Sequence, residues 1–411
     1  MLTSYGLIIA SLIIFQYLVS VIASILNLKS LRGELPQEFA GVYNPDIYKK
    51  SQEYTRTKTR FGWVVSSIEL LATLLFWYFG GFAALDVWVR GWNFPLVFSG
   101  TLYMGTLAFV QYLAFLPFIV YSTFVIEERF GFNKTTLQTF ILDQMKAIFL
   151  GGAIGAVLLI CVLALLEYLG SAAWIYAWIA VAVFMFFMQF ISPKWILPLF
   201  NRFEPLPEGE LHDAIFDYAK KVKYSLKEIF VVDGSRRSTK TNAYFTGFGK
   251  NKHIALYNTL IEKHTTEELV SVLAHEIGHY KKRHISIFMG LSVLHAGILF
   301  FLLSLFLKLP GVFEAFYIQE MSAYTGLAIF SLSFTPIHSL ISIFLNWVSR
   351  IHEFEADAFS AKTANGADTM ICALKKLSKD NLENLFPHPM LVWLEYSHPP
   401  MLERIEALRR I

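Results

Sequence analysis

Seven apolar blocks, each long enough to cross a lipid bilayer, limit what this 411-residue chain can fold into more than any other feature. A bilayer span needs roughly 20 mostly apolar residues in a helix. Seven stretches reach that length, and they cover residues 5–26, 61–85, 96–125, 147–169, 172–191, 285–307 and 322–348. The blocks predict a mainly α-helical, polytopic membrane protein with seven transmembrane helices.

The composition of the whole chain agrees with a membrane protein. Hydrophobic residues make up 55% of the chain, charged residues make up 16%, and the mean hydropathy is +0.48. Soluble domains average about 25% charged residues. The net charge of +3 carries no sign of a nucleic-acid partner. Cys161 lies in the fourth block and Cys372 near the end of the chain, so we expect neither a disulfide framework nor a cysteine metal site.

Basic residues gather in the segments that follow the odd-numbered blocks, whereas the segments after the even-numbered blocks are nearly free of Lys and Arg. Because positive residues favour the cytoplasm, we expect the N-terminus outside and the C-terminus inside. The first block has no basic residue ahead of it and no small-residue cleavage site after it, which favours a retained span over a signal peptide. The alternation of basic and nearly uncharged segments places segments 192–284 and 349–411 on the same, cytoplasmic side, where they can build one site.

The first of these segments contains His275-Glu276-Ile277-Gly278-His279. The two histidines are four residues apart, so on a helix both imidazoles project from one face. Neutral imidazoles at that spacing can ligate one Zn²⁺, and Glu276 can take a proton from a zinc-bound water. Five-letter patterns with three fixed residues also occur by chance, so the motif alone leaves a coincidental match open.

Around the motif, segment 192–284 mixes helix and strand. Residues 209–223 are typical of an amphipathic helix, and residues 228–233, 243–247 and 253–257 are typical of short strands. Thr265 or Thr266 can cap a helix that continues through both histidines to about residue 283. A small sheet beside a zinc-binding helix suits peptide hydrolysis, because an edge strand can pair with an extended substrate.

A catalytic zinc ion usually has three protein ligands and a water, so a third ligand is needed on the same side of the membrane. Residues 349–361 follow the last block and favour a helix, on which Glu353 and Asp357 share a face. Glu355 is about 200° from Glu353 around the helix axis, so an ideal helix cannot direct the two carboxylates to the same site. We assign Glu353 as third ligand and Asp357 as acceptor for the outer N–H of a ligating histidine. The alternative is an acidic, solvated helix at the membrane boundary.

Several further motifs accompany these residues in a characteristic order and spacing: residues 127–134, 198–201, 205–207, 242–245, 273–279, 353–357 and 397–404. On these motifs, which extend over most of the sequence, the chain resembles the type I CAAX prenyl endopeptidase family, integral-membrane zinc metalloproteases of the gluzincin kind. The resemblance implies that seven helices enclose a large chamber, with a small zincin-like α+β domain and the zinc site at its cytoplasmic end.

The resemblance also implies roles for individual residues. His275, His279 and Glu353 would ligate one Zn²⁺ per chain, with Glu276 as the base. His398 and Arg404 would lie near the substrate or the developing oxyanion, and the strand with Asn242, Ala243 and Tyr244 would align the peptide. Without the resemblance, His398 is only part of a rigid turn before a final helix, and Arg404 is a surface charge.

These expectations divide the chain into four parts. Residues 1–191 would hold five transmembrane helices, 192–284 the zincin-like segment, 285–348 the last two transmembrane helices, and 349–411 a cytoplasmic helical segment that completes the zinc site. The compact loop between the last two spans and the absence of a dilysine ER-retrieval tail favour a prokaryotic member, in which prenylated substrates are not expected.

Several functions remain open at this stage. The enzyme would hydrolyse membrane-associated proteins or C-terminal CAAX-type peptides, prenylated or not. It could instead be a quality-control protease without prenyl specificity, or a transporter or scaffold with structural zinc, although no paired repeats with broken helices indicate a transporter. Its expected partners are a peptide or protein substrate and the lipid bilayer, with no nucleic acid, and the sequence does not predict the oligomeric state.

A few residues inside the predicted spans are polar: Glu69, Gln111, His295 and His338. Such residues are costly against lipid, so each should line a water-filled chamber or hydrogen-bond to a neighbouring helix. Pro117 and Pro336 should kink their helices.

Overall fold

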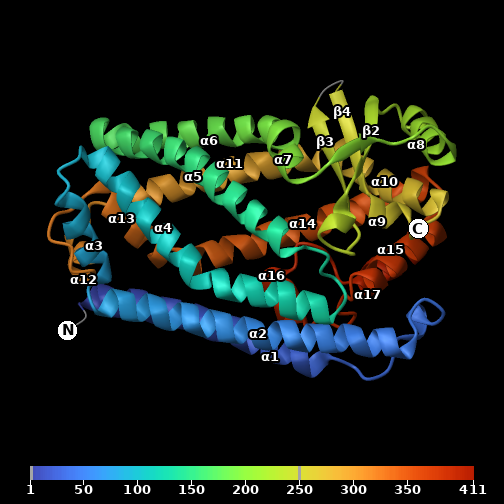
Figure 1. The fold of residues 1–411 in the computed structure, drawn as a ribbon, viewed down its shortest axis with the longest axis horizontal. Coiled ribbons are helices and arrows are strands. Elements are labelled where there is room, and N and C mark those ends of the chain that lie inside the picture. Colours follow the sequence, from blue (N-terminus) through green and yellow to red (C-terminus); the bar gives the residue numbers. More distant parts are fainter. Residues whose placement is uncertain (1–2, 249–250) are drawn as a thin grey trace.

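The computed structural model describes residues 3–248 and 251–411, and most of these residues lie in long helices that run along one common direction (Figure 1). Within this described part, six helical stretches are long and apolar enough to cross a membrane, and a bent pair of helices makes a seventh span. The spans are α1 (Ser4–Ser30), α2 (Pro45–Tyr78), Leu96–Glu127 with α4 (Leu96–Tyr121), α5 (Leu137–Tyr168), Gly170–Phe200 with α6 (Ala173–Ile191), α11 (His284–Phe306), and the pair α13 (Ala323–Ser333) and α14 (Thr335–Thr363). Six of the seven predicted spans are thus confirmed as single helical stretches, and the seventh is present if the bent pair counts as one span.

The second predicted span is wrong at its end. We expected it to continue to residue 85, but α2 ends at Tyr78, and a separate helix, α3 (Gly81–Arg90), follows. Gly80 between them has a φ of 74°, a left-handed conformation that only glycine adopts at low cost. The apolar run is therefore interrupted by backbone conformation, which hydropathy does not detect.

The seventh span is bent where α13 meets α14. The two helices make an angle of 57° on either side of Phe334, and Pro336 lies in the first turn of α14. Proline has no N–H to donate to the preceding turn, so a helix begins readily at this position and cannot continue smoothly through it. The predicted kink at Pro336 is confirmed. Pro117 lies inside α4 without ending it, five residues before the π-helical segment Ser122–Glu127.

A four-stranded sheet lies at one end of the helical bundle (Figure 1). Its strand order is β1 (Phe203–Pro205), β2 (Leu226–Val232), β4 (Asn251–Tyr257) and β3 (Ala243–Phe248). Strands β2 and β4 are parallel, whereas the two outer pairs are antiparallel. The three predicted strands are present, and β1 is an addition that its short, proline-ended sequence did not reveal. Among the described residues β3 is an edge strand, as expected.

The remaining helices are short or surround this sheet. The amphipathic helix predicted for 209–223 is α8 (Glu210–Lys221), and α10 (Thr266–Lys281) carries the His-Glu-x-x-His motif. The others are α7 (Leu197–Phe200), α9 (Asn258–Ile261), α12 (Pro310–Ala315), α15 (Ala367–Asp380), α16 (Pro389–Glu395) and α17 (Met401–Arg409), with further short turns at Gln37–Phe39, Gly170–Ala172, Ser192–Ile196 and Gly234–Arg236.

The sheet, α10, α15 and α17 lie together at one end of the molecule, while α3, α12 and α13 lie at the opposite end (Figure 1). The N-terminus is near the second end and the C-terminus is at the first (Figure 1). Segments far apart in sequence, before α11 and after α14, therefore meet at one end, because two spans, an even number, lie between them. Which end faces the cytoplasm stays a prediction from the loop charges.

Two of the polar residues inside the spans contact each other. The imidazoles of His295 on α11 and His338 on α14 stack, with ring centroids 5.3 Å apart and an interplanar angle of 14°. Glu69 and Gln111 are exposed in the isolated chain. The histidine pair thus joins the sixth and seventh spans near the bend.

Candidate metal centre

The centre is built where α10 and α14 pack unusually close together. A Cβ at Gly278 would lie 3.2 Å from the Ala356 Cα and 3.2 Å from the Phe359 Cβ, so a larger residue would force α10 and α14 apart by a few tenths of an ångström. One turn away, the buried Ser360 hydroxyl donates a hydrogen bond of 2.6 Å to the Ser271 carbonyl. These small residues bring the carboxylates of α14 within reach of the histidines of α10.

A reciprocal cap fixes the start of α10. The Thr265 hydroxyl accepts a hydrogen bond from the Glu268 backbone N–H, and the Glu268 carboxylate accepts one from the Thr265 N–H. Lys376 of α15 donates to the same carboxylate at 2.8 Å. This capping box satisfies N–H groups that a helix start leaves without intrahelical partners. It holds α10 in one register beneath the site.

Three side chains converge on one point: His275, His279 and Glu353. The two histidine Nε2 atoms are 3.1 Å apart. Glu353 places one carboxylate oxygen 3.4 Å from the His275 Nε2 and the other 3.3 Å from the His279 Nε2. Tetrahedral ligands at zinc–ligand distances of 2.0–2.2 Å lie roughly 3.3–3.5 Å from one another. The three groups are therefore spaced as ligands of a single small cation.

The chemistry of this cluster also fits a metal ion. The Glu353 Oε2 is buried and has no hydrogen-bond partner among the described residues, and the Arg404 guanidinium lies 3.5 Å from it. A metal ion would supply this oxygen with the direct partner that it lacks. Burial alone would lower the pKa of His275, but the hydrogen bond with Asp357 and the nearby Glu353 carboxylate outweigh it and raise that pKa. An environment that favours a proton on a buried imidazole also favours a divalent cation.

Asp357 and Arg404 support the cluster from behind. The Asp357 Oδ1 lies 2.9 Å from the His275 Nδ1, which leaves the Nε2 free to face the other ligands. Arg404 of α17 is buried and donates two hydrogen bonds to Asp357, at 2.8 and 2.6 Å, and lies 3.5 Å from Glu353. The expected contact between Asp357 and His275 is present, and its role in orienting a metal ligand stays a prediction. Arg404 contacts the carboxylates, and its expected role toward substrate stays a prediction.

A second support, which the sequence did not reveal, holds His279. Its Nδ1 lies 3.0 Å from the Nδ1 of His284, whose Nε2 lies 3.0 Å from the Glu355 carboxylate. If the His279 Nε2 binds a metal, its Nδ1–H donates to His284, and the His284 Nε2–H donates to Glu355. Arg283, with a φ of 61°, separates α10 from α11 and so turns His284 back toward the motif. Glu355 thus reaches the site through His284, although it is on another face of α14 from Glu353.

Two cavities flank the centre. Glu276 and His279 border a cavity of about 470 Å³ whose other walls are side chains of the membrane helices α6 and α11. A larger cavity of about 1010 Å³ is lined by Asn242, His398 and Arg404 together with residues of α1, α2, the loops and the C-terminal segment. The Glu276 side chain is half-buried at the edge of its cavity, and this burial raises the pKa of its carboxyl.

The residues expected to bind substrate lie mostly in the larger cavity. The His398 Nε2 is 3.4 Å from the Glu353 carboxylate, and this side chain is 64% exposed, so it can face both the metal cluster and a ligand. Asn242 is exposed and precedes the edge strand β3, in which Ala243 pairs with Leu256 of β4. Tyr244 follows in the same strand, but its side chain lies outside the described residues.

Segment 127–134 connects this cavity to the membrane helices. The Glu127 carboxylate accepts hydrogen bonds from the Tyr54 hydroxyl at 2.7 Å and from the Lys240 ammonium at 2.9 Å. The Lys240 ammonium also lies 4.4 Å from the centroid of the Phe132 ring. Because Tyr54 and Lys240 line the larger cavity, this motif fixes the cavity wall rather than the metal cluster.

Comparison with known proteins gives this geometry a family. Residues 24–202 match the family model described as CAAX prenyl protease N-terminal, five membrane helices, and residues 205–411 match peptidase family M48. The chain belongs to peptidase family M48. The CAAX prenyl protease 1 homolog of Oryza sativa subsp. japonica is 35% identical, over 96% of this chain and 95% of that relative. The CAAX prenyl protease 1 of Saccharomyces cerevisiae is 31% identical, over 91% and 88%.

A solved structure agrees over the whole length. The crystal structure of S. mikatae Ste24p matches with a TM-score of 0.93 at 30% identity and covers 99% of both chains. The protein is therefore an integral-membrane metalloprotease with the Ste24p-like fold, in which membrane helices enclose a chamber, and it acts on peptide substrates. The predicted family, fold class and enzyme class are confirmed. The relatives named here are eukaryotic, and the predicted prokaryotic source of this chain stays a prediction.

Proposed function

We propose that this M48 peptidase binds one Zn²⁺ per chain through His275, His279 and Glu353 and uses it to hydrolyse peptide bonds with Glu276 as general base. The observation that carries the proposal is the convergence of the three ligand atoms, which all lie within 4.8 Å of one another. Among the described residues this group has three members, which leaves a fourth position for water, as in catalytic rather than structural zinc sites.

Zinc bound there would lower the pKa of a water molecule and polarise the scissile carbonyl. Glu276 follows His275 directly and lies about 100° round the helix, beside the ligand face. Its carboxylate takes the proton of the attacking water and passes it to the leaving amine.

The residues in the larger cavity would position the substrate. His398 donates a hydrogen bond to the oxyanion that develops on the scissile carbonyl, which its exposed position beside Glu353 permits. The backbone of Asn242, Ala243 and Tyr244 aligns the peptide as an added strand, because β3 is at the edge of the described sheet. Arg404 holds Asp357 and Glu353 in place and borders the same cavity.

The second set of supporting contacts would keep His279 in its metal-binding tautomer. His284 accepts from the His279 Nδ1–H and donates to Glu355, so the free electron pair of His279 stays on Nε2. Each histidine ligand then has its own carboxylate support, Asp357 directly for His275 and Glu355 through His284 for His279.

We further propose that the centre faces the cytoplasm and that the substrates are membrane-associated proteins cut near the C-terminus. The loop charges support the orientation, and the names of the relatives, CAAX prenyl proteases, support C-terminal and prenylated substrates. The four-part division of the chain at residues 191, 284 and 348 belongs to this proposal. One helix, α14, contains both the last span and the ligand Glu353.

Three peptides separate the candidate activities. The purified full chain, with zinc, is given a CAAX-type peptide with a farnesylated cysteine, the same peptide without lipid, and an unstructured reporter peptide. A CAAX-processing enzyme cuts the farnesylated peptide with the highest kcat/KM, and a chelator abolishes turnover until zinc is restored. Equal cleavage of all three peptides would indicate a quality-control protease. No cleavage of any peptide by the zinc-loaded chain would refute the proposed activity.

A further inference from the structure

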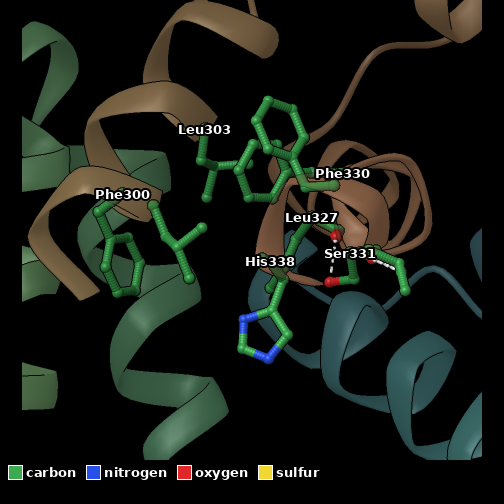
Figure 2. A pocket seen from close by; sticks show the side chains of 9 residues that line it. Phe300, Leu303, Leu327, Phe330, Ser331 and His338 are labelled. Atoms are coloured by element: carbon green, nitrogen blue, oxygen red, sulfur yellow. Dashed lines mark hydrogen bonds between the residues drawn. The ribbon is translucent and has the colours of Figure 1, made fainter. Parts of the chain in front are cut away.

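Three cavities in the described part of the chain differ in the charge of their walls. A cavity of about 300 Å³ between α11 and α13 is walled mainly by apolar side chains such as Leu303 and Phe330 (Figure 2). The cavity that Glu276 and His279 border has no Lys or Arg among its described lining residues. The larger cavity beside the metal centre is different, because its lining includes three cations: Lys58, Lys240 and Arg404.

Lys58 and Lys240 share a single carboxylate. The Lys240 ammonium donates to the Glu127 carboxylate at 2.9 Å, and the Lys58 ammonium lies 3.9 Å from its other oxygen. The Lys58 and Lys240 ammonium groups also lie 5.4 and 5.3 Å from the centroid of the Tyr54 ring. Among the described residues, Glu127 is the one carboxylate that pairs with either ammonium. The pair therefore has one positive charge without a direct carboxylate partner.

The other charged groups of the larger cavity come from the C-terminal part of the chain. Arg404 is already paired with the carboxylates of the metal centre. Glu383 and Glu395 line the cavity as well, and both lie between α15 and α17. Lys58 comes instead from α2, and Lys240 from the segment just ahead of β3. The unpaired positive charge thus lies beside the start of the edge strand.

The backbone ahead of β3 shows where an added peptide strand would have to stop. The Asn242 carbonyl accepts a hydrogen bond from the Tyr257 N–H, so the Asn242 backbone faces β4. Because residues of an antiparallel strand face alternate sides, Thr241 and Ala243 present their backbone groups to the free edge of the sheet. The Thr241 N–H already donates to the Asn381 side chain at 3.2 Å. A peptide that pairs with β3 at Ala243 therefore cannot continue as a strand past Thr241.

Charge then decides which end of the peptide lies at this stop. Lys240 precedes Ala243 by three residues, about 10 Å of extended chain, so a peptide bound at the edge brings its terminus or a bend beside the two ammonium groups. A free C-terminus has a carboxylate, which the unpaired charge of Lys58 and Lys240 attracts, whereas a free N-terminus would be repelled. The peptide then runs antiparallel to β3, which is the commoner arrangement of neighbouring strands.

From these observations we propose that Lys58 and Lys240 bind the free C-terminal carboxylate of the peptide substrate and so favour cleavage within a few residues of a chain end. This inference rests on the proposed function and adds to it a recognition site and a direction for the peptide. Glu127 and the Tyr54 hydroxyl hold the Lys240 ammonium in place before a substrate arrives. Lys58 is the more available of the two, because its side chain is 52% exposed and it lies beyond hydrogen-bond distance of Glu127.

The test compares a peptide acid with the amide of the same peptide. Lys58→Gln removes one ammonium group, and Lys49→Gln is the matched control, because Lys49 is exposed on the same helix and outside the lining of the cavity. The zinc-loaded wild type and both variants are assayed on an unlipidated peptide with a free C-terminus, on its C-terminal amide, and on a form extended by several residues at the C-terminus.

We expect the wild type to cut the acid with a kcat/KM roughly tenfold above that of the amide and of the extended form, chiefly through KM. This is the effect of about one charge-assisted hydrogen bond to a half-exposed group. The preference should shrink as salt is raised, because partly exposed charges are screened. Lys58→Gln should lose the preference by slowing cleavage of the acid alone, and Lys49→Gln should keep it.

A binding measurement separates recognition from chemistry. A fluorescent peptide acid should bind the Glu276→Gln protein more tightly than its amide does in fluorescence anisotropy, and adding Lys58→Gln should remove that difference. Equal cleavage of the acid and the amide by the wild type would overturn the inference while still establishing the protease. An unchanged preference in Lys58→Gln, or an equal loss on all three peptides, would overturn it as well. If the wild type cuts none of the peptides, the proposed function fails and this inference fails with it.

Discussion

Replacing Arg404 by leucine tests how the two buried carboxylates of the centre are held. The Arg404 guanidinium donates to Asp357 at 2.8 and 2.6 Å and lies 3.5 Å from Glu353, and all three side chains are at least 92% buried. Removing one partner of a buried ion pair costs about 3–5 kcal/mol, because the remaining charge is left uncompensated. The metal-free Arg404→Leu protein should lose that amount of unfolding free energy.

Arg410→Leu is the matched control. Arg410 pairs with Glu406 on the same helix, α17, but the two side chains are 75% and 67% exposed. An exposed pair at this spacing contributes about 0.3–0.5 kcal/mol, so Arg410→Leu should be nearly neutral. The measurement is denaturant unfolding in detergent micelles of each variant, after chelation and again with saturating zinc.

Zinc should reduce the loss in Arg404→Leu, because a divalent cation beside Glu353 and His275 compensates part of the negative charge that the arginine leaves behind. The reasoning would be refuted if Arg404→Leu and Arg410→Leu lost the same free energy. It would also be refuted if Arg404→Leu lost more unfolding free energy with saturating zinc than after chelation. In that case the cation would not compensate the negative charge of Asp357 and Glu353.

Three further predictions concern the supports of the centre. His284→Ala should raise the zinc dissociation constant about 10–100-fold in chelator competition, because His279 loses its orienting partner. His284→Asn, which keeps a hydrogen-bond acceptor, should raise the constant less. An unchanged constant in both variants would exclude this role of His284. Thr265→Ala should lower the unfolding free energy by about 0.5–2 kcal/mol through loss of the capping box, and Thr265→Ser should restore it; equal stability of both variants would contradict the cap. His398→Ala should lower kcat about 100-fold or more while zinc content stays at one ion per chain; full kcat, or loss of zinc, would contradict a role at the oxyanion.

Much of the fold followed from local patterns that the structure keeps. The lengths of the apolar blocks predicted the spans. The alternation of charge between successive loops predicted that segments 192–284 and 349–411 lie on the same side, and they lie at the same end of the bundle. Helical spacing was enough to propose that Glu353 joins His275 and His279. The two histidines share one face of an ideal helix, and Glu353 and Asp357 share one face of another. The close contact that completes the cluster depends on Gly278, whose role becomes visible only when α14 packs against α10.

What the sequence did not reveal depends on breaks in regular backbone. Gly80 ends the second span earlier than hydropathy indicates, because a left-handed residue redirects the chain inside an apolar run. Arg283, also left-handed, redirects the chain after the motif. His284 therefore contacts His279, whereas an unbroken helix would point it elsewhere. Glu355 was set aside as a ligand because of its angle from Glu353, and that prediction missed its contact with the site through His284.

The central claim is that His275, His279 and Glu353 hold one zinc ion while Glu276 only moves protons. Zinc content and hydrolysis of an unlipidated reporter peptide should be measured together on the wild type, Glu276→Gln and Glu353→Gln. We expect one zinc per chain and no turnover for Glu276→Gln, and loss of both zinc and turnover for Glu353→Gln. Turnover by zinc-loaded Glu276→Gln, or one tightly bound zinc in Glu353→Gln, would contradict this claim.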